Sequence, residues 1–215
     1  MSSAFNLQMP FDPRNIFPVS DGIARPEITT LSGGTVNFSK CSLEGVTIED
    51  VAVPLSRIPR FNGQTRKHYS VAEHCLWVAR YLARLARNQR VDPMVPFIEG
   101  LLHDAQEAFL CDLPSPLKHY LGDSEYAHLE HRLGFEVYRL TGWNVHYGSV
   151  PGSVLKGADL VAYAVENRDL RGGPDHSYLP HDRIIPVGDT DVVAREYINA
   201  VINPCGYMSE KGILE

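Results

Sequence analysis

Apolar residues at helical spacing in the middle of the chain constrain the fold more than any other feature of the sequence. Ser70 and Glu73 have the spacing of a capping box, in which each side chain satisfies a backbone amide of the first helical turn. The helix that follows carries an apolar stripe at intervals of four, three and four residues, formed by Val71, Cys75, Val78 and Leu82. His74 lies beside this stripe, so we expect its imidazole to face the interior.

The same pattern predicts helices on both sides of this one. Asp92 and Pro93 suit an N-cap followed by proline at the first helical position, and this helix is expected to run to about Leu110. Proline lacks the backbone amide and restricts the residue before it, so Pro114 and Pro116 must end the helix. A short helix or turn interrupted by Pro54 is predicted for residues 48–57, with Thr47 as its N-cap. The remaining predicted helices cover about 123–141, 154–167 and 191–203.

Residues that favour β-structure are confined to the N-terminal third. They flank Gly33 and Gly34, which suit the turn of a hairpin, and residues 1–27 are rich in Pro, Asn, Asp and Ser with no sustained period. We therefore predict an all-α helical bundle with a small β-hairpin and an extended N-terminal arm. The expected divisions are an extension at 1–46, a helical core at 47–170, and a loop plus C-terminal helix packed on the core at 171–215.

Charge and composition exclude several classes of function. The 215 residues carry a net charge of −6, which does not suit a nucleic-acid polymer or a membrane surface as the partner. A polyanionic small molecule would need a local basic pocket or a metal ion to overcome this field. The four cysteines form no CxxC pair, no signal peptide is apparent, and no stretch approaches the ~18 apolar residues of a membrane span. We expect a cytoplasmic protein.

Four imidazole and carboxylate side chains lie on or beside apolar helical faces, and they are the candidate metal ligands: His74, His103, Asp104 and Asp159. A buried carboxylate is costly unless it has a partner or a metal. Two imidazoles and two carboxylates suit Mn²⁺, Co²⁺, Fe²⁺ or Zn²⁺. Periodicity alone leaves two interpretations open, hydrogen-bonded core residues or a metal site. A His-Asp pair also arises by chance, as in the polar segment at 181–182.

The segment after His103 adds groups suited to phosphate chemistry. Glu107 lies four residues further on and would share the helical face of His103. Asp112 and Lys118 follow in a stretch made rigid by proline. These residues supply carboxylates for proton transfer and a cation for phosphate.

Basic residues before the capped helix are a second source of positive charge. Arg57 is the candidate for the site. Surface ion pairs are the expected role of Arg60, Arg66 and Lys67, although these cations could also serve the additional phosphates of a triphosphate.

Three runs of sequence together resemble the HD-domain phosphohydrolase superfamily: SVAEHCLWVA, LLHDAQEAFLCDLPSPLKHY and LKGADLVAY. More narrowly, they are similar to the branch that holds bacterial deoxyribonucleoside 5′-nucleotidases and phage deoxynucleoside triphosphate triphosphohydrolases, including dATP-selective ones. The resemblance covers roughly residues 50–170. It is specific because the spaced H…HD…D pattern occurs together with the complete block from His103 to Lys118.

The resemblance implies a role for each candidate. The implied ligands of a divalent cation (Mn, Co, Zn, Fe or Mg) are His74, His103, Asp104 and Asp159. Glu107 and Asp112 would handle the attacking water and its proton. Arg57 would contact phosphate near the metal, and Lys118 would hold phosphate at the rim.

The nucleoside would lie beside residues 113–116 by the same resemblance. The nucleotidase branch carries a tryptophan next to the sugar, directly after the matching arginine. Ile58 stands at that position here, so the contact with the sugar is expected from Ile58 or passes to Phe61.

The sequence therefore predicts a metal-dependent phosphohydrolase of small-molecule deoxynucleotides that works as a homo-oligomer. The expected activity is that of a dNTP triphosphohydrolase, with dATP as the candidate preferred substrate, and a dNMP 5′-nucleotidase is the alternative. Two other classes stay open. One is a di-iron oxygenase on the same scaffold, to which His128 and His131 would add ligands, and the other is a non-catalytic nucleotide sensor.

Overall fold

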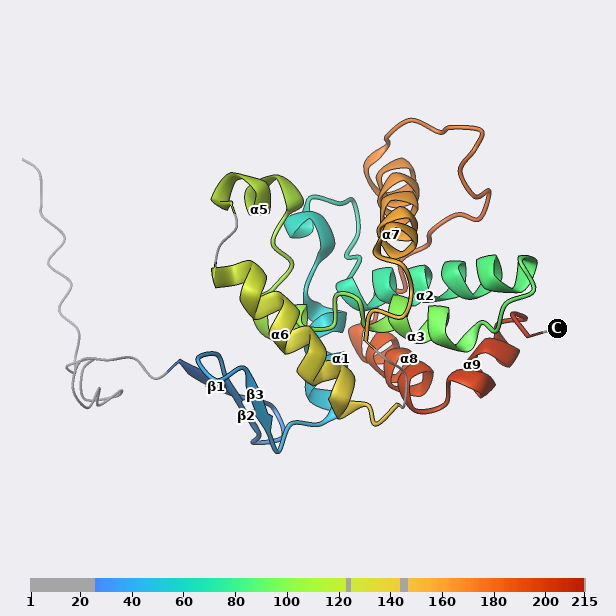
Figure 1. Ribbon diagram of the computed structural model, residues 1–215. Helices are drawn as coiled ribbons and strands as arrows, with labels where there is room; N and C mark the ends of the chain where they lie inside the picture. Colours follow the sequence, from blue (N-terminus) through green and yellow to red (C-terminus); the bar gives the residue numbers. More distant parts are fainter. Residues whose placement is uncertain (1–25, 123–124, 144–146, 215) are drawn as a thin grey trace, which may run out of the picture.

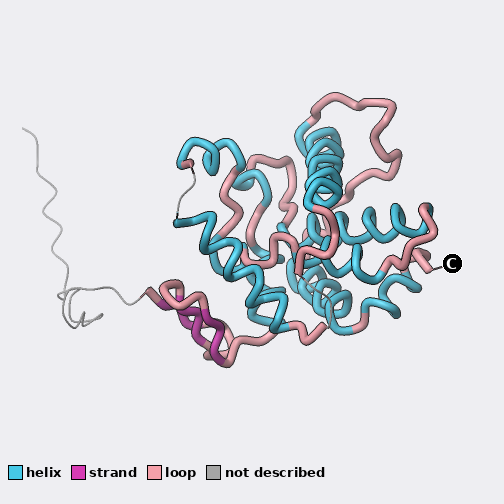
Figure 2. The backbone as a smooth tube through the Cα atoms, viewed as in Figure 1, coloured by secondary structure: helices cyan, strands magenta, loops and turns pink. Residues whose placement is uncertain are grey.

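The structure, a computed structural model, describes residues 26–122, 125–143 and 147–214. Most of these residues are helical, and a small antiparallel sheet lies near the N-terminal end (Figures 1 and 2). The mostly helical architecture predicted from periodicity is thereby confirmed. Nearly all of the expected N-terminal arm lies outside the described residues. None of the helices within these ranges is long and apolar enough to cross a membrane.

The elements follow in a simple order along the chain. The strands are β1 (Glu27–Thr29), β2 (Thr35–Asn37) and β3 (Ser42–Glu44). The helices are α1 (Ile48–Arg57), η3 (Arg60–Gly63), α2 (Val71–Asn88), α3 (Met94–Leu102), α4 (Glu107–Leu110), α5 (Ser115–Leu121), α6 (Glu125–Leu140), α7 (Gly152–Glu166), η4 (Asn167–Arg171), α8 (Thr190–Ile202) and α9 (Pro204–Glu210).

Helices α2 and α3 form the centre of the bundle. α2 begins at the predicted capping box, where the Ser70 hydroxyl accepts from the Glu73 amide at 3.3 Å and the Glu73 carboxylate accepts from the Ser70 amide at 2.9 Å. α3 packs against α2 at Gly100, where a Cβ atom would lie only 2.9 Å from the Cα atom of Ala79. Only glycine permits this approach. Gly100 therefore sets the separation of the two helices.

One large apolar core joins α1, α2, α3 and α8. α8 packs along α1, and both helices contact α2. Tyr197 of α8 is fully buried and donates its hydroxyl to the carbonyl oxygen of Leu101 at 2.8 Å. Burying a large apolar side chain contributes about 1.5–3 kcal/mol. This core holds the helices that carry the candidate ligands in fixed positions.

The N-terminal sheet has the order β1-β2-β3, with both pairs antiparallel. Val36 in the central strand lies opposite Ile28 of β1 and Leu43 of β3. It is fully buried in a small apolar cluster with Leu133 of α6. The predicted hairpin is therefore confirmed. β3 adds a third strand that was not predicted, because a strand of three residues is too short to show a clear alternating pattern.

The single helix expected from Asp92 to Leu110 is two helices, α3 and α4, so that prediction was wrong in extent. Residues 103–106 form a tight turn in which hydrogen bonds join residues three apart, including the one from the Glu107 amide to the Asp104 carbonyl at 3.0 Å. Glu107 is therefore not placed by simple four-residue helical spacing.

The proline-rich segment ends one helix, as predicted, and also begins another. α5 starts at Ser115 and carries Pro116 in its first turn, where the missing amide costs no hydrogen bond. The prolines predicted only the end of the preceding helix at this point. The additional short helix carries Lys118.

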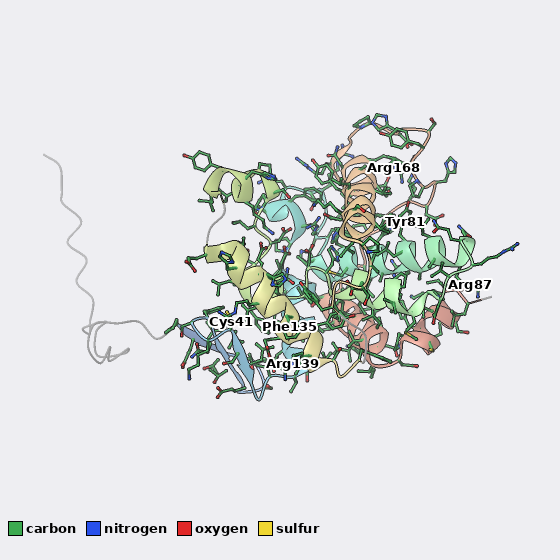
Figure 3. The ribbon with its side chains drawn as sticks, in the orientation of Figure 1. Cys41, Tyr81, Arg87, Phe135, Arg139 and Arg168 are labelled. Atoms are coloured by element: carbon green, nitrogen blue, oxygen red, sulfur yellow. The ribbon has the colours of Figure 1, made fainter. Side chains whose placement is uncertain are left out.

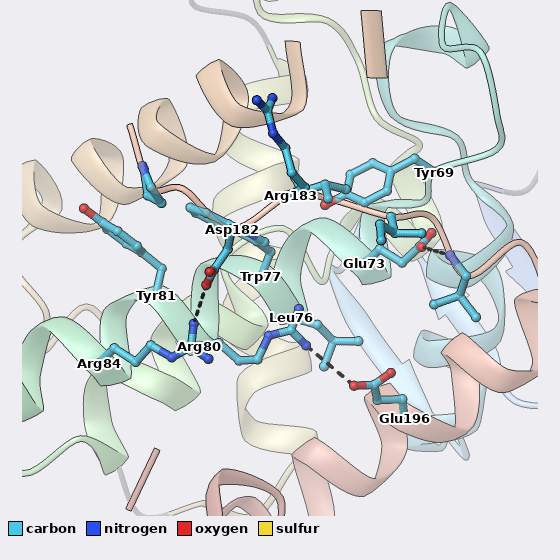
Figure 4. A pocket seen from close by; sticks show the side chains of 14 residues that line it. Tyr69, Glu73, Leu76, Trp77, Arg80, Tyr81, Arg84, Asp182, Arg183 and Glu196 are labelled. Atoms are coloured by element: carbon cyan, nitrogen blue, oxygen red, sulfur yellow. Dashed lines mark hydrogen bonds and ion pairs between the residues drawn. The ribbon is translucent and has the colours of Figure 1, made fainter. Parts of the chain in front are cut away.

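Residues 172–189 form a long loop that packs against α2 and η4. Arg168 of η4, labelled in Figure 3, donates to the carbonyl oxygens of Pro180 at 2.8 Å and Asp182 at 3.0 Å. Nearer the other end of the loop, the Glu73 carboxylate accepts from the Val187 amide at 2.9 Å (Figure 4). Between these contacts the loop and α2 enclose a cavity of about 320 Å³.

Candidate functional site

The structure brings the four predicted ligand side chains together at the centre of the bundle. His74 comes from α2, His103 and Asp104 from the turn after α3, and Asp159 from α7. The Nε2 atoms of the two histidines lie 3.2 Å apart. The Asp104 Oδ2 atom is 3.2 Å from His103 Nε2, and the Asp159 Oδ1 atom is 3.4 Å from His74 Nε2. One ligand atom each from His74, His103 and Asp159 fit within 4.8 Å of one another, a spacing that can hold a metal ion.

The outer nitrogens of both imidazoles have partners that can only accept a proton. His74 Nδ1 lies 2.6 Å from a Glu166 carboxylate oxygen, and His103 Nδ1 lies 2.8 Å from the Gly100 carbonyl oxygen. Each Nδ1 therefore donates, so in the neutral ring, the form that binds a metal, each Nε2 would turn a lone pair toward the centre. Two lone pairs facing each other at 3.2 Å repel unless a cation lies between them. The donor set fits a divalent metal ion.

The electrostatics of the centre favour positive charge at the same point. Burial would lower the pKa of His103, but the adjacent Asp104 raises it well above its ordinary value. Burial would likewise raise the pKa of Asp104, but His103 lowers it far below its ordinary value. The two carboxylates thus stabilise a cation in the centre.

Glu166, the last residue of α7, is a site residue that the sequence analysis missed. It is fully buried and orients His74 through the 2.6 Å hydrogen bond. A signal for it existed, because Glu166 lies seven residues after Asp159 on the same helical face. Buried carboxylates that hold a ligand histidine are a common outer layer of metal sites.

The structure places Arg60, and not Arg57, in the site. Only 11% of the Arg60 side chain is exposed, and its guanidinium contacts Asp112 at 3.2 Å and Glu166 at 3.5 Å. By contrast, 58% of the Arg57 side chain is exposed, and its guanidinium faces Asp191 on the surface at 3.7 Å. The expectation that Arg60 forms a surface ion pair was therefore wrong.

A backbone turn explains why Arg60, and not the predicted Arg57, faces the site. Phe61 and Asn62 have positive φ angles of 56° and 51°, which reverse the chain directly after Arg60. The Arg60 amide also bonds the Tyr69 carbonyl oxygen at 2.9 Å. Ile58, expected near the sugar, is partly buried against the main apolar core and also lines a cavity that includes Asp112.

Phe61 lies in an aromatic group next to this turn. Its ring is 5.7 Å from the ring of Tyr163, which follows Asp159 by one helical turn. The guanidinium of Arg171 lies 4.9 Å from the centre of the Phe61 ring. An aromatic pair and a cation thus lie one helical turn from the Asp159 ligand.

Glu107, Asp112 and Lys118 also reach the site. Glu107 is buried, one of its oxygens has no hydrogen-bond partner among the described residues, and the other lies 3.5 Å from the Lys118 ammonium. Burial and the nearby Asp104 and Asp112 raise the pKa of Glu107 well above its ordinary value. Lys118 also pairs with Glu130 at 2.6 Å. The centre thus holds a carboxyl group suited to proton transfer beside a cation.

The two histidines of α6 do not join the centre. Among the described residues, the cluster of potential ligands contains neither His128 nor His131. The ring of His131 instead packs against Tyr147 at 5.7 Å. The extra ligands that a di-iron oxygenase would need are therefore not supplied from this helix.

Comparison with known proteins identifies two relatives. The chain is 34% identical to the uncharacterized protein YfdR of Escherichia coli over 155 residues, which are 71% of this chain and 76% of that protein. It is 33% identical to an uncharacterized protein of Rhodobacter capsulatus over 144 residues, which are 66% of this chain and 71% of that protein. No protein-family model matches the chain.

Proposed function

We propose that this chain, which belongs to the same family as YfdR of Escherichia coli, is a metal-dependent phosphohydrolase of the HD-domain type that acts on deoxynucleotides. One observation carries the proposal. His74, His103 and Asp159 bring one potential ligand atom each within 4.8 Å of one another, and Asp104 lies 3.2 Å from His103. The cations Arg60 and Lys118 pair with the neighbouring carboxylates of Asp112 and Glu107. A divalent cation bound there supplies Lewis acidity to a phosphoryl oxygen and acidifies water.

The protein's own residues supply the remaining chemistry. Glu107 accepts or returns a proton at its unpartnered Oε2 atom, because burial and the nearby Asp104 and Asp112 raise its pKa and favour the protonated form. Asp112 holds the Arg60 guanidinium by a 3.2 Å ion pair. Arg60 keeps a buried Nε–H without a partner in the described part of the chain, so it can donate to a phosphate oxygen without breaking an existing bond. Stabilising charge on such oxygens is the main task in phosphoryl transfer.

Additional cations near the centre favour a triphosphate over a monophosphate. Lys156 lies one turn before Asp159 and reaches its carboxylate at 2.6 Å, while 61% of the Lys156 side chain is exposed. Arg171 stands over Phe61 as described above. These groups can follow a chain of phosphates outward from the metal. We propose release of tripolyphosphate from dNTPs, and release of phosphate from dNMPs is the alternative.

A substrate panel tests this function directly. Chelator-treated protein is reloaded with Mn²⁺, Co²⁺, Zn²⁺ or Mg²⁺ and incubated with each dNMP and dNTP, and the products are separated by anion-exchange chromatography. Tripolyphosphate plus deoxynucleoside is the expected outcome. Inorganic phosphate from dNMPs would support the alternative, and no product with any pair of metal and nucleotide would refute the proposal. Arg57→Met is the control for Arg60→Met, because only Arg60 lies in the site.

A further inference from the structure

The cavity of about 320 Å³ between α2 and the loop at 172–189 is separate from the metal centre (Figure 4). Among the described residues, its lining includes none of the four candidate ligands. α2 and the loop supply most of the lining, and Glu196 of α8 completes it. The volume is at the lower end of the range for small-molecule sites, roughly 300–1,000 Å³. The cavity therefore has room for a small organic molecule.

The loop that covers this cavity is anchored on both sides of it. On one side Arg168 donates to the carbonyl oxygens of Pro180 and Asp182. On the other side the Val187 amide donates to Glu73, the residue that also caps α2. These bonds hold the loop and α2 apart across the cavity. A site that is formed in advance loses less conformational freedom when a ligand binds.

Two of the three carboxylates in the lining already have close donors. Glu73 accepts from the amide and from the hydroxyl of Ser70, both at 2.9 Å, in addition to the loop amide. Glu196 accepts from the Tyr207 hydroxyl and pairs with the Lys211 ammonium, both at 2.8 Å. The lining therefore has little accepting capacity to offer a cationic ligand.

The guanidinium groups of Arg80 and Arg84 have donating capacity beyond their present contacts. They lie one turn apart on the face of α2 that lines the cavity. Arg80 uses its Nη1 atom to contact the Tyr207 hydroxyl at 2.7 Å and Glu196 at 3.5 Å. Arg84 uses its Nη1 atom to contact Asp182 at 3.4 Å. Because a guanidinium carries five N–H donors, contacts through one nitrogen leave donors for an anion.

The pair of Arg84 with Asp182 can be exchanged for a ligand anion at little cost. The Arg84 side chain is 51% exposed, and that of Asp182 is 79% exposed. Ion pairs between exposed side chains contribute little to stability. A carboxylate or phosphate group of a ligand can therefore take the place of Asp182, and both groups match the planar fork of a guanidinium.

The rest of the lining is largely apolar or aromatic. Trp77 and Tyr81 stack with ring centroids 5.2 Å apart and an interplanar angle of 10°. The other residues of this kind that contact the cavity include Leu76, Pro180, Ile184, Ile185 and Val187. Such walls suit the apolar body of a ligand.

We propose that this cavity binds a small organic anion. Its carboxylate or phosphate group bonds the guanidinium groups of Arg80 and Arg84, and its apolar or aromatic body packs against the walls around Trp77. A bare inorganic ion would leave those walls in water, and an uncharged ligand would leave the donors of the two arginines unused.

Calorimetric titration of the full chain, loaded with metal, tests the class of ligand. The probes are phenyl phosphate, benzoate, inorganic phosphate and benzyl alcohol. We expect the first two to bind saturably, and their order shows which anionic group fits the two arginines. The other two each lack one half of the ligand and should bind at least about 10-fold more weakly. The proposal is refuted if neither aromatic anion binds, or if inorganic phosphate binds as tightly as phenyl phosphate.

Arginine variants locate the bound anion. Arg84→Met and Arg80→Met should each reduce the affinity for phenyl phosphate about 10-fold or more, because bonds to a charged group are lost. Arg84→Met is the decisive variant if loss of the bond from Arg80 to Tyr207 lowers stability. Arg139→Met is the matched control, since Arg139 pairs with Glu136 of its own helix, and it should bind like wild type.

Asp104→Ala separates this cavity from the metal centre. It should keep the wild-type affinity for phenyl phosphate while it loses metal. Loss of binding in D104A with full binding in R84M would place the anion at the metal centre and refute the proposal.

Trp77 gives a readout from within the cavity. The chain has two tryptophans, Trp77 and Trp143, so in Trp143→Phe all tryptophan emission comes from Trp77. Phenyl phosphate should change this emission with the midpoint found by calorimetry, and Arg84→Met in the same background should remove the change. Binding by calorimetry with no change in the emission of folded W143F would place the ligand elsewhere.

Discussion

Two regions bury charged side chains: the ion-pair cluster of Arg168 and Asp169, called the Arg168 cluster below, and the candidate metal centre. They satisfy those charges differently. Arg168 bonds both oxygens of Asp169, at 2.7 and 2.9 Å, and two loop carbonyls. Asp169 also accepts from the Ile184 amide at 2.8 Å. In the metal centre, by contrast, buried polar atoms of Arg60, Glu107 and Glu166 have no hydrogen-bond partner among the described residues.

This difference indicates two roles for buried charge. The charges of the Arg168 cluster hold a loop in place, whereas those of the candidate metal centre are available to a ligand. A cluster that serves only the fold gains by pairing every donor and acceptor. A site that binds an ion and an anion must keep some of them unpaired, and it costs stability until they bind. Mutations in the two regions should therefore affect different measurements, stability in one and metal binding or turnover in the other.

The largest expected effect is from Asp104→Ala in the metal centre. This change removes a charged ligand, so phosphohydrolase activity should fall to background and metal affinity should fall with it. Metal content after gel filtration and product chromatography check both outcomes. Full turnover by a cleanly folded D104A protein would contradict the site assignment.

Glu107→Gln should have the next largest effect, and on turnover alone. The amide cannot exchange the proton that we assign to Glu107, and loss of general acid-base catalysis typically costs about 10²- to 10⁴-fold. Metal content should stay at the wild-type level. If the bound metal is lost as well, Glu107 is a ligand and its proposed role is wrong.

In the Arg168 cluster, Arg168→Met should affect stability and not chemistry. It leaves the buried Asp169 without its main partner, which we expect to cost about 3 kcal/mol. Denaturant unfolding measures that cost. Activity per folded molecule should be unchanged, and a loss of turnover at full folding would show that the two regions are coupled.

Glu166→Gln tests the outer layer of the metal centre. The glutamine keeps the shape but removes the negative charge that fixes the His74 tautomer, so metal affinity should fall about 10- to 100-fold. Competition with a metal indicator measures the affinity. Denaturant stability of the metal-free protein should change little, and a change as large as that of R168M would mean that Glu166 serves the fold instead.

The smallest expected effect is the pH dependence contributed by the Arg168 cluster. Burial opposes ionisation of Asp169, but hydrogen bonds from Arg168, the Ile184 amide and Arg183 lower its pKa to about 2. A pKa that is lower in the folded state adds stability above the ordinary value of about 4, and this contribution is lost as the pH falls through about 2. Wild type should therefore lose more stability than Asp169→Asn over this range in acid unfolding.

The sequence could predict that His74, His103 and Asp159 come together because each lies on or directly after a helical apolar stripe, and helical spacing is regular. His74 illustrates this, since one capping box fixes both the start of its helix and the face it turns inward. The choice between Arg57 and Arg60 could not be predicted in this way. It depends on the positive φ angles at Phe61 and Asn62. Asn62 followed by Gly63 does mark a turn, but a turn signal does not say which of the two arginines faces the interior.

Glu166 and Glu107 illustrate two other limits of the sequence. Helical spacing places Glu166 on the same helical face as Asp159. Its contact with His74, however, joins positions 92 residues apart and exists only in the folded bundle. The position of Glu107 depends on the tight turn at 103–106, which has no glycine or proline to mark it. Long-range contacts and unmarked turns therefore account for most of what the sequence did not predict.

Gly100 controls how the two imidazoles of the candidate metal centre face each other. Its missing side chain fixes how closely α3 approaches α2, and its carbonyl oxygen holds the His103 ring. Both the separation and the tilt of the two imidazoles are thus set at one residue outside the ligand set.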